Sequence, residues 1–386
     1  MSFDGSKAAC AVHQIGSRSR ICIHSSLGDF MFAKKNVVAA AALTLVAVAA
    51  QAQVTVYGNL DVSVGRKQQF DLTAPVVNGK FAKTSTTNVD SSDMSDSFIG
   101  FKGQEDLGGG LKALFKLESE LAVDTGAAAG DTFWNRNATV GVAGSFGTVS
   151  LGRFENLFKL EGGAFNPFGT SSTFSPTFNA LNVTGGSWSN GVSYVSPNLG
   201  GLTLSAQYSA KEAAKSTAAN YSGGAVAVSA NFVAGPLALS AVISDFRSAD
   251  PATATAATGP AQKSRPWLLG ASYDFGAVKL FGQYAESKTK DKTAGDVGKV
   301  KGFQLGVAVP VTADGTVLAS YGEGKATTPT VGGSLKERDV SVGYTQNLSK
   351  RTNVYAAVIN ERDKNTIVIN AKGTITSFAV GVRHSF

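Results

Sequence analysis

Hydrophobic and polar residues alternate through most of this chain, and the last stretch, residues 373–386 (GTITSFAVGVRHSF), shows the pattern clearly. Even-numbered positions from Thr376 to Phe386 are mostly apolar, whereas odd-numbered positions from Ile375 to Ser385 are small or polar. Successive side chains of a β-strand point to opposite faces, so this period of two predicts a strand with one apolar face. A strand of a soluble β-sandwich alternates in the same way, so this stretch alone leaves both interpretations open.

The same alternation recurs in about sixteen segments, which is an even number. The segment 111–121 is the sharpest, because Leu111 and the apolar side chains after it share one face. Charged side chains occupy the other face: Lys112, Lys116, Glu118 and Glu120. A soluble protein would present those charges to bulk water, and a large barrel would present them to a water-filled interior.

Short turns alternate with long polar loops along these segments. The long polar stretches include residues 66–96, 287–301 and 361–372. Transmembrane β-barrels have short turns on one side of the membrane and longer loops on the other. The pattern therefore predicts an all-β, antiparallel transmembrane barrel, with apolar residues toward lipid and polar residues toward its interior.

The stretch 155–187 differs from the rest, because it is long, aperiodic and rich in Phe and Gly. Loops of this length without their own secondary structure are functional or disordered. A high aromatic content disfavours disorder. We therefore expect this loop to pack against another part of the protein.

One apolar run, residues 37–50, is shorter than the roughly 20 residues of a transmembrane helix. It follows Lys34 and Lys35, and it ends at an Ala-Gln-Ala box at residues 50–52. Positive residues, an apolar core and a small-x-small box in this order are typical of a secretory signal peptide. A buried core helix is the alternative interpretation.

These observations predict the domain organisation. Residues 31–52 are expected to be the signal peptide, and residues 53–386 the barrel. Residues 1–30 are expected to be a mis-assigned upstream extension, because a complete signal begins at Met31. Amino-terminal sequencing of the mature protein would then begin at Gln53.

The expected mature chain carries little catalytic or metal-binding chemistry. It has no cysteine, and its only histidine is His384. Without residues 1–52, five basic and two acidic residues are lost, so the formal charge falls from +7 to +4. No Gly-x-Ser-x-Gly motif, no His/Cys cluster and no basic cluster with interleaved aromatics is present. We therefore expect no enzyme, no cofactor, no metal site and no nucleic-acid partner.

Four motifs in order along the chain resemble the general-diffusion porins of Gram-negative outer membranes, specifically the beta-proteobacterial type. The motifs are residues 54–61 (VTVYGNLD), 103–113 (GQEDLGGGLKA), 147–153 (GTVSLGR) and 381–386 (GVRHSF). The resemblance covers residues 53–386.

This resemblance implies a homotrimer of sixteen-stranded barrels in the cell outer membrane, with the third loop (155–187) folded into the lumen. It implies a water-filled channel for passive diffusion of ions and small hydrophilic solutes. It also implies contact with outer-membrane lipid and lipopolysaccharide. The barrel-assembly machinery would recognise the terminal strand through Phe386.

The resemblance also assigns residues to the constriction. Arg136 and Arg153 would face acids of the third loop, Glu155 and Glu161, with Lys159 beside them. The wider pore lining would include Asp61, Lys112, Lys116, Glu118 and Glu120. The chain departs from the family at two places: Phe98 stands where an arginine is common, and the third loop lacks a Pro-Glu-Phe-Gly-Gly segment.

The two arginines fall on the apolar side of the alternation, and this needs an explanation. Arg136 has the parity of the apolar Val140 and Val142, and Arg153 has that of Leu151. Either β-bulges intervene, or these arginines lie beyond the apolar band.

Three other functions remain as alternatives. A barrel acting mainly as a surface adhesin or receptor would lack conductance in a planar bilayer. A barrel enzyme would need a base, and His384 has the parity of the lipid-facing Val382 and Phe386. A secreted β-sandwich, in which Glu118 and Glu120 serve glycoside hydrolysis, would be soluble without detergent.

Overall fold

The computed structural model describes residues 53–130, 132–181, 186–210, 222–248, 262–291, 295–329, 332–367 and 370–386. The chain divides into two units, Met1–Gln51 and Ala52–Phe386. The predicted upstream extension and signal peptide lie outside the described residues. Within the described ranges, no helix is long and apolar enough to cross a membrane.

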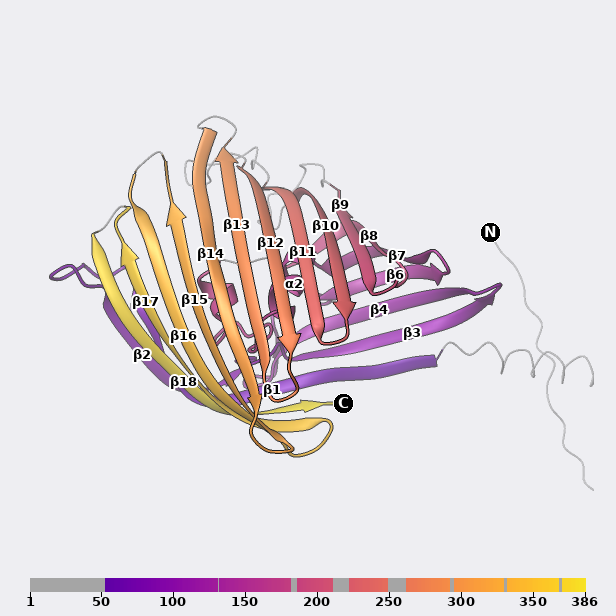
Figure 1. Cartoon of the computed structure of the whole chain (residues 1–386), viewed down its shortest axis with the longest axis horizontal. Helices are drawn as coiled ribbons and strands as arrows, with labels where there is room; N and C mark the ends of the chain where they lie inside the picture. Colours follow the sequence, from indigo (N-terminus) through magenta and orange to yellow (C-terminus); the bar gives the residue numbers. More distant parts are fainter. Residues whose placement is uncertain are drawn as a thin grey trace, which may run out of the picture. The chain divides into compact units, whose positions relative to one another are not determined.

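The described part of the second unit is built from antiparallel β-strands that form one sheet. Its strands are β1 (Gln53–Asp71), β2 (Ala82–Ser91), β3 (Phe98–Gly108), β4 (Leu111–Ala122), β5 (Ala127–Ala128), β6 (Asn137–Gly144), β7 (Gly147–Glu155), β8 (Ser187–Val195), β9 (Leu202–Ser209), β10 (Ser222–Ala234), β11 (Leu237–Ser248), β12 (Gln262–Asp274), β13 (Lys279–Asp291), β14 (Gly295–Pro310), β15 (Gly315–Thr327), β16 (Ser334–Asn347), β17 (Thr352–Asn365) and β18 (Ala371–Ser385). Each strand pairs with its neighbours around the curved wall in Figure 1.

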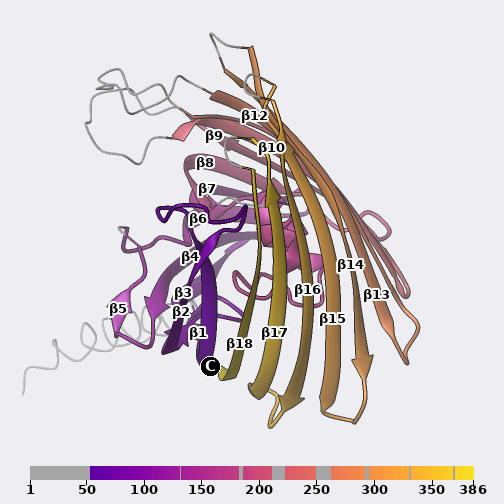
Figure 2. The same cartoon turned by 90° about the vertical axis from the view of Figure 1, so that its left-hand side faces the viewer.

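The sheet closes on itself. β1 pairs with β3 along one edge and with β18 along the other, and Figure 2 shows β1 beside β18. β2 and β3 occupy one course of the wall, because both pair with the same edge of β1. The two-residue β5 pairs only with the end of β4. The eighteen described strands therefore make sixteen courses, and the predicted sixteen-stranded antiparallel barrel is confirmed.

The alternation in the terminal segment has the predicted orientation. Phe378 and Val380 of β18 are 51% and 60% exposed, whereas Ser377 and Ala379 are 4% and 1% exposed. The exposed apolar row continues across the pairing onto β1, where Val64 lies opposite Val380. An apolar outer face and a small or polar inner face suit a wall between lipid and water.

The connections follow the predicted asymmetry only in part. At the end that carries Phe386, the connections between strands contain two to six residues. At the other end, the predicted long loops at 287–301 and 361–372 are wrong, because β13, β14, β17 and β18 extend through most of these residues. The predicted long polar stretch at 66–96 is also wrong in part, because it contains the end of β1 and all of β2. These stretches are polar on both faces, so backbone pairing continues there without an alternation of apolar and polar residues.

The segment between β7 and β8 packs against the inside of the wall, as its composition predicts. It contains α2 (Leu157–Ala164) and α3 (Pro176–Asn179), and we call residues 156–186 the inner loop. Leu157 and Phe158 cluster with Val242 and Leu268. These wall residues point inward, since the next residues along their strands, Ile243 and Leu269, are 55% and 52% exposed on the outer face.

A second cluster holds the far part of the inner loop. Phe168 and Phe174 pack with Tyr355 and Ile359 of β17, and Phe174 and Ile359 are fully buried. Burial of a phenylalanine side chain contributes about 1.5–3 kcal/mol. The phenylalanines therefore hold the inner loop against the wall at both ends.

Candidate functional site

Arg136 lies just before β6 and joins four carboxylates. Its Nη1 is 3.4 Å from Glu120 Oε1 and also contacts the Asp96 carboxylate. Its Nη2 is 3.2 Å from Glu155 Oε2, and its Nε is 3.7 Å from Glu118 Oε2. Only 11% of the Arg136 side chain is exposed. A cation so enclosed is stabilised by the carboxylates that surround it.

Lys159 is the second cation of this group and belongs to the inner loop. Its Nζ lies 3.1 Å from Asp96 Oδ2 and 3.2 Å from Glu155 Oε1. Asn156 caps the start of α2, where its side chain accepts a hydrogen bond of 2.8 Å from Lys159 N. Burial alone would lower the pKa of Lys159, but the carboxylates of Asp96 and Glu155 raise it above the ordinary lysine value.

We call this group the Arg136 network: Asp96, Glu118, Glu120, Arg136, Glu155 and Lys159. It draws residues from β4, β7, the inner loop and the connections before β3 and β6. Four carboxylates and two cations give it a formal charge of minus two. The network ties the first turn of the inner loop to the barrel wall.

Neighbouring side chains extend the network across the wall. Tyr57 donates a hydrogen bond of 2.7 Å to Glu118 Oε1, and Lys116 Nζ lies 3.0 Å from the same oxygen. The guanidinium of Arg136 lies 4.7 Å from the centre of the Phe98 ring. Phe98, which stands where the resembling family often has an arginine, therefore supports the remaining arginine through a cation–π contact.

Arg153 reaches the inside of the wall through a bulge. The pairing of β7 with β8 shifts register between Gly152 and Phe154, and Gly152 has a φ of +127°, which favours glycine. Arg153 Nε donates to Asn135 O at 2.8 Å, and its Nη1 donates to Ser189 Oγ at 2.6 Å. Within the described residues, Arg153 forms no direct ion pair with a carboxylate, and the nearby charge that acts on it is Glu120.

The two arginines therefore leave the apolar face for different reasons. A β-bulge turns Arg153 to the inside, as one alternative predicts. Arg136 precedes the first residue of β6, so the alternation within that strand does not apply to it.

Two residues expected on the pore lining have other roles. Glu161 does not face Arg136 or Arg153, because it is 6% exposed and points to β10 and β11. There it accepts hydrogen bonds from Asn231 Nδ2 at 2.7 Å and Ser240 Oγ at 2.8 Å. Glu155 ends β7, whereas Glu161 lies on α2, where successive side chains turn by about 100°. The two carboxylates therefore need not share a direction.

Asp61 is also enclosed, with no exposed surface. It accepts hydrogen bonds from Tyr355 Oη at 2.7 Å and from the amides of Met94 and Ser95 at 2.8 and 2.7 Å. Asp61 therefore fixes the bend at residues 92–97 between β2 and β3, and does not line the open interior.

The remaining predicted residues lie nearer the end with the short turns. Lys112 is exposed and lies opposite Asp106 and Ala143 in the sheet. Phe386 exchanges backbone hydrogen bonds of 3.1 and 3.3 Å with Gly58. A Cβ at Gly58 would lie 2.5 Å from the Phe386 ring, so only glycine admits the ring at this spacing.

The sequence did not identify the bend at 92–97 as part of the site. Asp96 binds both cations of the Arg136 network, and Asp93 accepts a hydrogen bond of 2.8 Å from Thr173 of the inner loop. Lys67 also forms an ion pair with Asp93. The run of Ser and Asp at residues 91–97 could have indicated charged partners, but the same composition is typical of an exposed loop.

A Gram-negative porin family model matches residues 39–366 of this chain. The chain belongs to the Gram-negative porin family. Outer membrane porin protein 32 of Delftia acidovorans is 33% identical over 380 residues, which cover 92% of this chain and 100% of that protein. An outer membrane porin protein of Bordetella pertussis is 30% identical over 408 residues, with the same coverage of 92% and 100%.

A solved structure described as an anion-selective porin from Comamonas acidovorans is also similar to this porin. Its TM-score is 0.72 at 28% identity, and the match covers 87% of this chain and 100% of that one. The predicted outer-membrane, general-diffusion porin is thus confirmed, and its activity is transport rather than catalysis.

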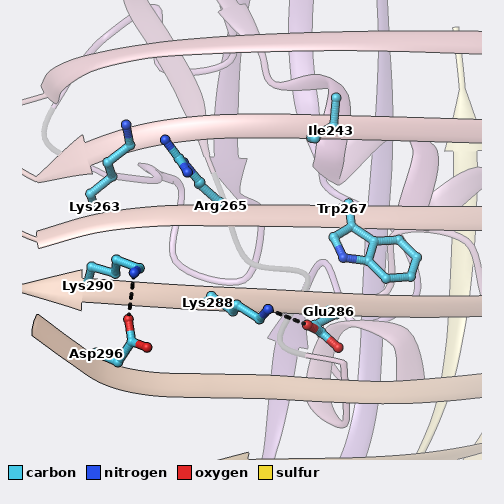
Figure 3. A pocket seen from close by; sticks show the side chains of 8 residues that line it. All are labelled: Ile243, Lys263, Arg265, Trp267, Glu286, Lys288, Lys290 and Asp296. Carbon is cyan, nitrogen blue, oxygen red and sulfur yellow. Dashed lines mark ion pairs between the residues drawn. The ribbon is translucent and has the colours of Figure 1, made fainter.

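The outer face of the porin carries a pocket of about 420 Å³ above its apolar surface. Ile243, which is 55% exposed, and Trp267 form its apolar side. Figure 3 shows the charged side chains around it, including the ion pair of Lys290 with Asp296 at 3.0 Å. The other charged lining residues are Lys263, Arg265, Glu286 and Lys288.

Proposed function

We propose that solutes crossing this porin meet their narrowest passage between the inner loop and the wall that carries the Arg136 network. A barrel of sixteen strands encloses an aqueous channel unless something fills part of it. The observation that carries the proposal is the ion pair of Lys159, in the inner loop, with Asp96 at 3.1 Å, which fixes the start of the inner loop against the bend before β3. The loop then occupies part of the cross-section, and the passage beside it is polar.

The charges of this passage would decide which ions cross readily. Fields are weakly screened where the wall has a low dielectric constant and the channel is narrow. The two cations of the Arg136 network offset two of its four carboxylates, and Lys116 pairs with Glu118 beside it. Arg153, which forms no direct ion pair with a carboxylate among the described residues, then contributes a positive field that favours anions.

Single-channel recording in a planar bilayer with a KCl gradient tests this role. The Arg153→Ala variant should shift the reversal potential toward cations. Arg362→Ala is the matched control, because Arg362 alternates with inward residues of β17 and faces outward, so its removal should leave selectivity unchanged. An unchanged reversal potential for Arg153→Ala would remove Arg153 from the narrow passage.

The short strands β6 to β9 support a homotrimer. β6 to β9 contain only eight or nine residues each, whereas β14 contains sixteen. At about 3.3 Å per residue and a tilt of about 45°, the short strands rise only about 20 Å, less than the apolar band of about 25 Å. Their exposed Val140, Leu151 and Val192 would therefore be covered by other copies of the chain rather than by lipid.

The outer face of the long strands β16 to β18 supports contact with phosphorylated lipid. On β16 to β18, one row of paired residues is Lys336, Lys364 and Lys372, and the next contains Arg338 and Arg362. These rows lie beyond the apolar row that contains Val342, Val358 and Phe378, at the end opposite the short turns. Lipopolysaccharide phosphates would meet these cations, as they would meet those around the pocket in Figure 3. Copurified glycolipid should decrease when Lys336 and Lys364 are both replaced by Gln.

The proposed processing and assembly rest on the two ends of the barrel. Gln53, where cleavage is expected, is the first residue of β1. Phe386 completes the pairing of β18 with β1, so it suits a signal read by the assembly machinery before closure. A mature chain that begins before Gln53 would contradict the first point.

A further inference from the structure

Four carboxylates occupy the two rungs on either side of the Arg338–Arg362 pair, where β16 pairs with β17. Glu337 lies opposite Asp363, and Asp339 lies opposite Glu361. All four side chains point to the inside of the barrel, because they share the parity of the fully buried Ile359 or its partner Ser341. Oxygens of Glu337, Asp339 and Glu361 lie within 4.8 Å of one another.

Nothing in the described part of the chain compensates the most buried of these groups. Asp339 has no exposed surface, and neither of its carboxylate oxygens accepts a hydrogen bond. The amide of Ala180 faces it, but that amide donates to Pro176 O at 2.9 Å. A buried carboxylate without a partner costs several kcal/mol. The site therefore requires a positive charge or a proton.

The nearest cations in the sequence cannot supply that charge. Lys336, Arg338, Arg362 and Lys364 alternate with the four acids and face the outside of the barrel. Arg338 pairs there with Glu323 at 2.9 Å. A ligand from solution is the remaining source of positive charge.

We propose that Glu337, Asp339 and Glu361 bind one Ca²⁺ ion on the inner face of β16 and β17. Oxygen-only ligands suit a hard cation, and three carboxylates supply enough negative charge for a divalent one. The three oxygens lie within 4.8 Å of one another, which is close enough for one Ca²⁺ with ligands at about 2.3–2.6 Å to reach all of them after small side-chain movements. Mg²⁺ demands a near-ideal octahedron and gives up water reluctantly, so three strand carboxylates suit Ca²⁺ better.

The site lies next to the inner loop, so a bound ion would affect how firmly that loop is held. α3 of the inner loop packs on β15 and β16 beside Asp339. A bound Ca²⁺ offsets two of the negative charges of the wall beneath α3, and so stabilises the inner loop in its place. The sequence predicted no metal site, because it has no His/Cys cluster and the pairing of two strands brings these acids together.

Ca²⁺ binding is measured on protein refolded without lipopolysaccharide, so that lipid-bound ions do not contribute. After EDTA treatment and its removal, equilibrium dialysis against Ca²⁺ alone should give one bound ion per chain for the wild type. Asp339→Asn and Glu361→Gln should each weaken binding at least tenfold. Asp314→Asn is the matched control, since Asp314 lies in the exposed 311–314 turn and should bind as the wild type does.

A second measurement does not depend on the variants folding. Chelation of Ca²⁺ should lower the thermal unfolding temperature of the wild type, and restored Ca²⁺ should recover it. Absence of stoichiometric binding at millimolar Ca²⁺ would overturn the proposal, as would equal binding by wild type and Asp339→Asn. Stabilisation of the metal-free wild type by acid, without any effect of Ca²⁺, would assign the cluster to shared protons and also overturn it. Neither measurement uses conductance, so failure here leaves the proposed narrow passage intact.

Discussion

Replacement of Arg136 by methionine tests whether one enclosed cation holds together the part of the wall from which the inner loop starts. Methionine keeps most of the length of the side chain and removes its charge. The substitution leaves Asp96, Glu118, Glu120 and Glu155 near one another with Lys159 as the only cation of the network. Breaking a buried ion pair by removing one partner costs about 3–5 kcal/mol, and 11% exposure places Arg136 in that class.

The free energy of unfolding is measured by guanidinium titration of the barrel in phospholipid vesicles, beside Arg362→Met as an exposed control. The control should change stability by less than about 0.5 kcal/mol. A double-mutant cycle with Glu155→Gln should give a coupling of about 1–3 kcal/mol, because the two residues are in contact. A loss below about 1 kcal/mol for Arg136→Met would mean that the pair behaves as a surface salt bridge, and would refute the reasoning.

Three further predictions concern other parts of the porin. Gly324→Ala places a Cβ 1.7 Å from Ala180 O, so it should displace α3, cost about 1–3 kcal/mol and change single-channel conductance. Gly282→Ala, whose Cβ would meet nothing closer than 3.6 Å, is its control and should leave conductance unchanged. Phe386→Ala should reduce the heat-modifiable folded band in outer-membrane fractions several-fold, and an unchanged band would exclude the residue from assembly. The raised pKa of Lys159 means that its stabilising charge is fully present below the ordinary lysine pKa of about 10.4 and is lost as pH rises through the higher folded value. The contribution of Lys159 to the free energy of unfolding should therefore stay constant between pH 7 and about 10. A loss of stability in this range that is seen in the wild type but not in Lys159→Met would contradict this.

The fold was accessible from the sequence because each barrel strand lies between two solvents. Lipid on one side and water on the other impose a period of two on residues such as 373–386, so strands and their outward faces could be predicted without tertiary information. The signal fails where both faces meet polar surroundings. The extension of β13, β14, β17 and β18 beyond the apolar rows was missed for that reason.

The site was only partly accessible. Arg136, Glu155 and Lys159 lie together, and Asp96 joins them only because Asp61 and Tyr355 fix the bend at 92–97. A contact between residues that lie 294 positions apart has no signature in local spacing.

The alternation along each strand is sufficient to assign its lipid-facing side, because hydrophobic burial acts on every residue of a strand independently of its partners. Where the charges meet depends instead on the folded barrel. A bulge at Gly152 directs Arg153, and the direction of α2 takes Glu161 to β10 and β11. The register of β16 with β17 gathers Glu337, Asp339 and Glu361. Strand register and loop direction follow from packing over the whole barrel, so no short stretch of sequence specifies them.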